Sequence, residues 1–105
     1  MKIDLLYFDG CPSWKQALAN LRTALDEEHL DNSINLIKIE TDRDAVKTKF
    51  LGSPSFQIDG EDLWPEPRTS YTMNCRIYPT GEGLNGWPTV EILRQKLIDI
   101  RKDKG

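Results

Sequence analysis

The feature that most constrains the fold is a cysteine between an apolar run and a long amphipathic segment. The run Ile3–Phe8 is almost entirely apolar, which is typical of a strand covered on both faces by helices. The segment Trp14–Leu30 repeats apolar residues at three- and four-residue steps and predicts a helix with one buried face. Cys11 and Pro12 therefore fall at a helix start, where free N–H groups favour a thiolate and a proline costs little. The loop position predicts that Cys11 lies near the surface and is accessible, and the nearby Asp9 would oppose the thiolate.

The middle of the chain predicts further strands and a short helix. Ile34–Ile39 reads as a second strand, and a strand–helix–strand unit of this length places its strands in parallel. Thr41 is a candidate N-cap for a short helix that Gly52 would end. A third strand, Ser55–Ile58, ends at the turn Asp59–Gly60.

The C-terminal part is harder to assign. A polar stretch, 61–74, contains two prolines, so we expect a long loop after the turn and no tight hairpin. Cys75–Tyr78 is predicted as a fourth strand, antiparallel to the third. Pro79–Pro88 reads as a loop, Val90–Ile100 as the last helix, and 101–105 as a fraying charged tail.

Length and charge limit the classes of protein. The 105 residues suffice for one modest core, so we expect a single domain over residues 1–105 in the α/β order β-α-β-α-β-β-α, with a central mixed four-stranded sheet flanked by helices. A net charge of −3 with interspersed Lys and Arg argues against nucleic acid or an anionic membrane as partner. No signal-peptide pattern or membrane-length apolar run is visible, which favours a cytoplasmic protein with reactive, metal-binding or simply reduced cysteines.

This order of elements resembles the thioredoxin fold. Cys11 lies between the first strand and the first helix, Ser53–Pro54 leads into the third strand, and a glycine-bearing loop precedes the last helix. The run Tyr7–Pro12 is also similar to small thioredoxin-like proteins with a Phe-acid-Gly-Cys-Pro motif. The resemblance covers nearly the whole chain, and it implies redox activity and a cis peptide bond between Ser53 and Pro54 that faces the cysteine.

The second cysteine of a thioredoxin motif is missing. Trp14 stands at its position, on the predicted buried face, so it should pack, and a local disulfide is impossible. Cys75 is then either a resolving thiol for Cys11 or a buried apolar residue. Antiparallel pairing would place Cys75 opposite Ile58, away from Cys11, whereas a disulfide needs Cα atoms within about 7 Å.

The predicted substrate site surrounds Cys11. A cis bond before Pro54 would leave the carbonyl and N–H of Ser53 exposed beside the sulfur. An extended substrate, or glutathione, could pair with them as an added strand. Pro12 and Ser13, next along the chain, are assigned to the same site.

Charged and aromatic residues of the loops are further candidates. Arg76 could stabilise a thiolate, hold a carboxylate or simply be a solvated charge, and Arg68 has the same alternatives. Trp87 and Trp64 each precede a proline. They could form the floor of a groove or cover the ends of the core.

Two functions from different classes follow. The first is a thiol–disulfide oxidoreductase of thioredoxin or glutaredoxin type, in which Cys11 attacks a protein or low-molecular-weight disulfide. Glutathione or another external thiol, or else Cys75, would resolve the mixed disulfide. The alternative is a non-catalytic module that docks a protein partner or captures a soft metal such as mercury through Cys11 and Cys75. We expect no cofactor and no dedicated metal site, because the only histidine is His29 and Cys-x-x-Cys spacing is absent.

Overall fold

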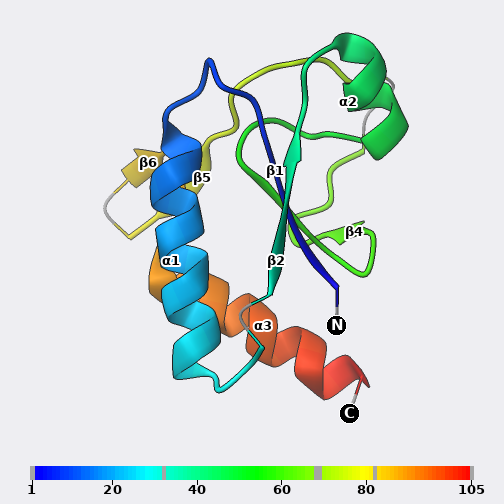
Figure 1. The fold of residues 1–105 in the computed structure, drawn as a ribbon. Coiled ribbons are helices and arrows are strands. Elements are labelled where there is room, and N and C mark those ends of the chain that lie inside the picture. The colour runs from blue at the N-terminus through cyan, green and yellow to red at the C-terminus, as the bar shows by residue number, and fades with distance from the viewer. Residues whose placement is uncertain (1, 32, 68–69, 82, 105) are drawn as a thin grey trace.

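In the computed structural model, four strands form one sheet in the order β2-β1-β3-β4 (Figure 1). The structure describes residues 2–31, 33–67, 70–81 and 83–104. The central strand β1 (Ile3–Tyr7) pairs in parallel with β2 (Ile34–Lys38) and antiparallel with β3 (Ser55–Ile58). The predicted α/β class and the mixed four-stranded sheet are confirmed.

The described residues form three helices, α1 (Ser13–Glu27), α2 (Asp42–Thr48) and α3 (Val90–Lys104). Thr41 caps α2 as predicted, because its hydroxyl oxygen accepts a hydrogen bond from the N–H of Asp44. The same helix ends earlier than predicted, with Lys49 in the left-handed conformation, so Gly52 is not its stop. None of the helices described is both long and apolar enough to cross a bilayer.

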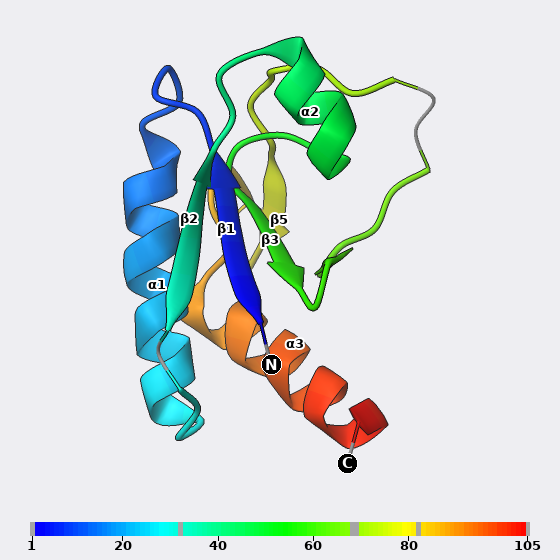
Figure 2. The same cartoon turned by 45° about the vertical axis from the view of Figure 1, so that its right-hand side comes forward.

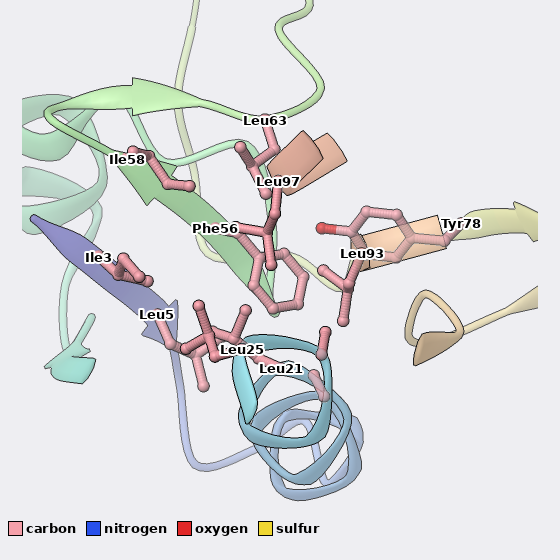
Figure 3. Close-up of a cluster of buried hydrophobic side chains, with 12 residues drawn as sticks. Ile3, Leu5, Leu21, Leu25, Phe56, Ile58, Leu63, Tyr78, Leu93 and Leu97 are labelled. Atoms are coloured by element: carbon pink, nitrogen blue, oxygen red, sulfur yellow. The ribbon is translucent and has the colours of Figure 1, made fainter. Parts of the chain in front are cut away.

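The two faces of the sheet are buried against different helices, because successive strand residues point to opposite sides. Ile3 and Leu5 of β1 join the larger cluster with Phe56 of β3 and with side chains of α1 and α3 (Figure 3). Leu6, the next residue along β1, points to the other face and packs with Phe50 beside α2. The near-continuous burial of β1 follows from this two-sided cover.

The last helix is longer than the sequence predicted. We expected the chain to fray from residue 101 onward, but α3 continues to Lys104. Arg94 and Arg101 both bind the carboxylate of Glu28 just beyond α1, at 2.9 and 3.5 Å. These ion pairs link α3 to the end of α1. The charge pattern of the sequence alone does not indicate them.

A tight hairpin follows β3, contrary to our prediction. Asp59 and Gly60 have φ values of 52° and 87°, which suit the primed turns of two-residue hairpins. β4 (Glu61–Asp62) then pairs antiparallel with β3. The expected fourth strand at Cys75–Tyr78 was therefore wrong, because β4 occupies that place in the sheet.

The segment predicted as a loop between Pro79 and Pro88 contains a second hairpin. β5 (Tyr78–Thr80) and β6 (Gly83–Asn85) form a separate two-stranded ribbon. Figure 2 shows the chain leaving β4, swinging away from the sheet and returning past α2 to β5. This return path brings the second cysteine, Cys75, next to Ser53.

Candidate thiol site

Cys11 lies in the turn between β1 and α1, as predicted, but it is not near the surface. Its N–H donates to the carbonyl of Phe8 at 3.2 Å, and α1 begins two residues later. The residue is only 3% exposed, and its Sγ donates to the carbonyl oxygen of Ser53 at 3.4 Å. The expected accessibility of Cys11 was wrong, because another part of the chain covers it.

The Ser53–Pro54 peptide bond is cis and faces Cys11, as the resemblance implied. Its polar groups are not exposed. Ser53 is fully buried; its N–H donates to the carbonyl of Asn74 at 2.8 Å, and its own carbonyl accepts from the N–H of Arg76 at 3.0 Å. The prediction of free pairing groups was wrong, because the backbone of residues 74–76 already bonds to this edge through a single bridge.

Cys75 lies at the centre of this docked segment and contacts Cys11. It forms an isolated parallel bridge with Ser53 and is exposed. The pKa of the Cys75 thiol is raised, first by a thiol–thiol hydrogen bond with Cys11, then by desolvation and by the charge of a Cys11 thiolate. Neither the expected position opposite Ile58 nor the buried apolar alternative is found.

Arg76 anchors the docked segment from the other side of the backbone. Its Nη1 donates to both carboxylate oxygens of Asp62, at 3.0 and 2.9 Å, and to the hydroxyl of Ser55 at 3.3 Å. Nη2 donates to the carbonyl of Trp64, and the guanidinium lies 5.2 Å from the ring centre of Tyr78. Of the alternatives left open, Arg76 therefore holds a carboxylate, and that carboxylate is internal.

This ion pair is buried and costly to break. The side chains of Arg76 and Asp62 are 4% and 8% exposed. Burial raises the pKa of Asp62, and the guanidinium acts against that shift. Removing one member of such a pair costs on the order of 3–5 kcal/mol, because the other charge stays buried. Arg76 thus fixes the position of its neighbour, Cys75.

Gly52 allows the segment to approach this closely. A Cβ at position 52 would lie 2.9 Å from the Cβ of Arg76 and 3.2 Å from its backbone nitrogen. The φ of Gly52 is also +122°, which side chains rarely adopt. The glycine that we expected to stop a helix instead leaves room for the docked segment.

The remaining predicted site residues lie around the start of α1. Pro12 is exposed at the N-cap position, and Ser13 is half-buried. The loop before α3 touches Ser13, because any Cβ at Gly86 would collide with the hydroxyl of Ser13. The structure therefore places Ser13 under a loop and leaves Pro12 free.

The tryptophans cover the core. Trp64 and Trp87 are half-buried and pack against the larger hydrophobic cluster. Trp14 stacks on Tyr7 with ring centres 4.2 Å apart and packs on the same cluster, which confirms that it is a packing residue. Arg68 lies outside the described residues.

The charges near the turn are paired. Asp9, which we expected to oppose a thiolate, binds Lys38 at 2.8 Å, and this contact raises the pKa of Lys38. Within the described part of the chain, no group of three or more His, Cys, Asp or Glu residues could hold a metal ion. A metal at the two thiols would thus have two protein ligands.

Asp62, which anchors the docked segment, was not among the residues predicted from the sequence. Asp62 follows the Asp59–Gly60 turn and pairs with Gln57 across the hairpin. Asp-Gly is a strong hairpin signal, so this register could have been proposed. Nothing in the sequence, however, indicated that Arg76 would return to Asp62.

Comparison with protein-family models, with curated proteins and with solved structures finds no match for this chain. We therefore infer function from the contacts of the chain's own residues. The most informative of these contacts is the pair of thiols beside the cis Ser53–Pro54 bond.

Proposed function

We propose that this protein is a thiol–disulfide oxidoreductase with a thioredoxin-like fold whose redox centre is the pair Cys11 and Cys75. The observation that carries the proposal is the contact between the two thiols next to the cis peptide bond before Pro54. The fold supports it, since the first cysteine follows β1 and precedes α1 in a mixed sheet flanked by helices.

The pair provides the two neighbouring sulfurs that the missing Cys-x-x-Cys motif would otherwise provide for an internal disulfide. Oxidation joins Cys11 Sγ to Cys75 Sγ and transfers two electrons to an external disulfide, which leaves as two thiols with the two protons. The docked backbone keeps Cys75 beside Cys11 in the reduced state. Formation of the bond requires the two Cβ atoms to lie about 3.8 Å apart, and the docked backbone limits how far Cys75 can lie from Cys11.

The partners of this chemistry are a protein or low-molecular-weight disulfide and a thiol such as glutathione. A cytoplasmic location suits it, because glutathione and related systems keep thiols reduced there between turnovers. The exchange requires no cofactor, since sulfur atoms carry the electrons throughout.

The test is a redox titration of the full chain. We expect the wild-type protein in glutathione buffers of rising oxidised fraction to lose both alkylatable thiols together, as a monomer without bound glutathione. Cys11→Ser and Cys75→Ser, the matched controls, should each gain a glutathione adduct or stay reduced. Persistent glutathione adducts or linked dimers in the wild-type protein would contradict an internal pair.

A second candidate function is capture of a soft metal ion, which the same contact favours. Two neighbouring thiolates suit ions such as mercury(II) or copper(I) that accept two sulfur ligands. We expect this function to appear as one tightly bound copper(I) per wild-type chain under a competing chelator, lost in either cysteine variant. Binding without any reversible disulfide would favour it over the oxidoreductase.

A further inference from the structure

From the burial of the two sulfurs we infer that the roles of the cysteines are the reverse of the thioredoxin arrangement: Cys75 exchanges with the substrate, and Cys11 is the internal resolving thiol. This inference rests on the proposed function and adds to it which sulfur meets the partner. It also revises the hypothesis from the sequence, in which Cys11 attacks first.

Access is the first reason. A thiol must reach a disulfide in line with its S–S bond, so exchange depends on exposure of the attacking sulfur. Cys11 is 3% exposed, and its Sγ points to the carbonyl of Ser53 inside the molecule. Cys75 is exposed. The sulfur available to a partner is therefore the one in the docked segment.

The occupied sheet edge is the second reason. An extended substrate could reach Cys11 only by pairing with the backbone of Ser53, whose N–H and carbonyl bond to Asn74 and Arg76. To vacate this edge the segment would also have to break the buried contacts of Arg76 with Asp62. A path through Cys75 breaks none of these bonds.

The exchange then runs in two displacements. The Cys75 thiolate attacks one sulfur of a substrate disulfide, that S–S bond breaks, and the departing thiolate takes a proton from solvent. Cys11 loses its proton to solvent and attacks Cys75 Sγ, which releases the second substrate thiolate. The substrate has gained two electrons, and the protein holds a Cys11–Cys75 disulfide. One external thiol attacks Cys75 Sγ, the exposed sulfur, and releases Cys11. A second external thiol then attacks the resulting mixed disulfide and releases Cys75, so that the two thiols leave joined as a disulfide and the protein is reduced.

The extended segment also gives Cys75 an apolar flank. Side chains alternate from residue 75 onward, with Arg76 and Tyr78 buried and Cys75 and Ile77 exposed. Ile77 is 63% exposed and lies two residues along the same face. A partner that reaches Cys75 thus contacts a small apolar surface. It does not contact the charged side chain of Arg76, because that side chain is buried.

The experiment compares the two single-cysteine variants in the full chain. Cys11→Ser and Cys75→Ser, each fully reduced, are mixed with oxidised glutathione, and formation of the adduct is followed by mass spectrometry. We expect Cys11→Ser, which keeps Cys75, to react at least about tenfold faster than Cys75→Ser, since exchange depends on access. In urea the two rates should converge, which shows that the fold causes the difference.

The outcomes separate this inference from the proposed function. Equal rates in the native state, or a faster Cys75→Ser variant, overturn the reversed roles even if the wild-type protein forms its internal disulfide. In a third outcome, Cys11→Ser reacts fast but the wild-type protein keeps its glutathione adduct. That result supports the exposure of Cys75 but overturns Cys11 as the resolving thiol. Native Cys75→Ser must also retain the wild-type circular dichroism spectrum; otherwise the comparison is repeated with Cys75→Ala.

Discussion

At the scale of single residues, the neighbouring Cys11 thiol shifts the pKa of Cys75. The thiol–thiol hydrogen bond and the charge of a Cys11 thiolate both raise the pKa of Cys75, and desolvation adds to them. The Cys75 thiol is therefore accessible, but it forms a thiolate only at higher pH while Cys11 lies beside it.

We predict that alkylation of Cys75 has an unusual pH profile. In the reduced protein its half-maximal rate with iodoacetamide should fall above the ordinary thiol value of about 8.5, and in Cys11→Ala it should move down toward that value. Free glutathione, measured alongside, gives the unshifted reference. An unchanged profile in Cys11→Ala would show that the hydrogen bond contributes nothing.

The same shift affects stability, with a definite sign. The pKa of Cys75 in the folded protein is raised above its unfolded value. The contribution of the protonated Cys75 thiol to the free energy of unfolding is therefore fully present below the unfolded pKa. It is lost as pH rises through the folded pKa. The reduced protein should therefore lose some stability in alkaline solution.

Residues of the site could be predicted only where the signal was local. Cys11 at a helix start and the cis bond before Pro54 follow from neighbouring residues or from the resemblance, and both were found. The contact of Cys11 with Cys75 depends on a chain return over many residues, and the anchor at Asp62 depends on that same return. Local patterns carry no information about such a path.

At the scale of elements, the docked segment depends on close backbone packing. Residues 74–76 bond to the backbone of Ser53, and the nitrogen, Cα and Cβ of Arg76 lie against the adjacent Gly52. A side chain at position 52 would push this segment away from β3. The alignment of the two sulfurs thus depends on a residue that contacts neither of them.

We predict that Gly52→Ala slows formation of the internal disulfide. The added methyl group meets the backbone of Arg76, so Cys75 should be displaced from Cys11, its alkylation rate should rise and oxidation should become slower. Gly83→Ala is the matched control, because Gly83 also has a positive φ, +110°, but nothing lies within 4 Å of the added atom.

Gly52→Ala and Gly83→Ala both place an alanine at a positive φ, which destabilises the folded state. Only Gly52→Ala also brings the added methyl group too close to Arg76. Unfolding in urea measures the shared cost, while the rate of disulfide formation measures the displacement. If the two variants oxidise equally fast, the close approach at Gly52 does not position Cys75.

The elements themselves divide into those that the sequence predicted and those that it did not. The strands and helices up to Ile58 have strong periodicity and were found within a few residues. Beyond Gly60 the strands have only two or three residues each, too short for any periodic signal. Their pairing is set by long-range contacts such as that of Arg76 with Asp62.

At the scale of the whole molecule, the thiol pair connects the first and last thirds of the chain. Cys11 belongs to the N-terminal strand–helix unit, while Cys75 precedes the β5–β6 ribbon and α3. A disulfide between positions so far apart closes a long loop in the unfolded chain. Such closure removes conformational freedom from the unfolded state, and the effect grows slowly with loop length.

We predict that oxidation stabilises the protein by up to about 4 kcal/mol, the value expected for closing a loop of this size. The urea midpoint of the oxidised wild-type protein should lie above that of the reduced form. Cys75→Ser, treated in the same way, should show no change between oxidising and reducing conditions. An oxidised form that unfolds at the same urea concentration as the reduced form would contradict the prediction.

The docked segment at residues 74–76 has a consequence for selectivity. An enzyme that binds an extended peptide along its own sheet can read the side chains on both sides of the target cysteine. Here the backbone groups of Ser53 already bond to residues 74–76, so a substrate finds no free N–H and carbonyl groups with which to pair. Discrimination would then depend on how far a disulfide protrudes from its carrier, and short flexible molecules would be favoured over disulfides held within folded domains.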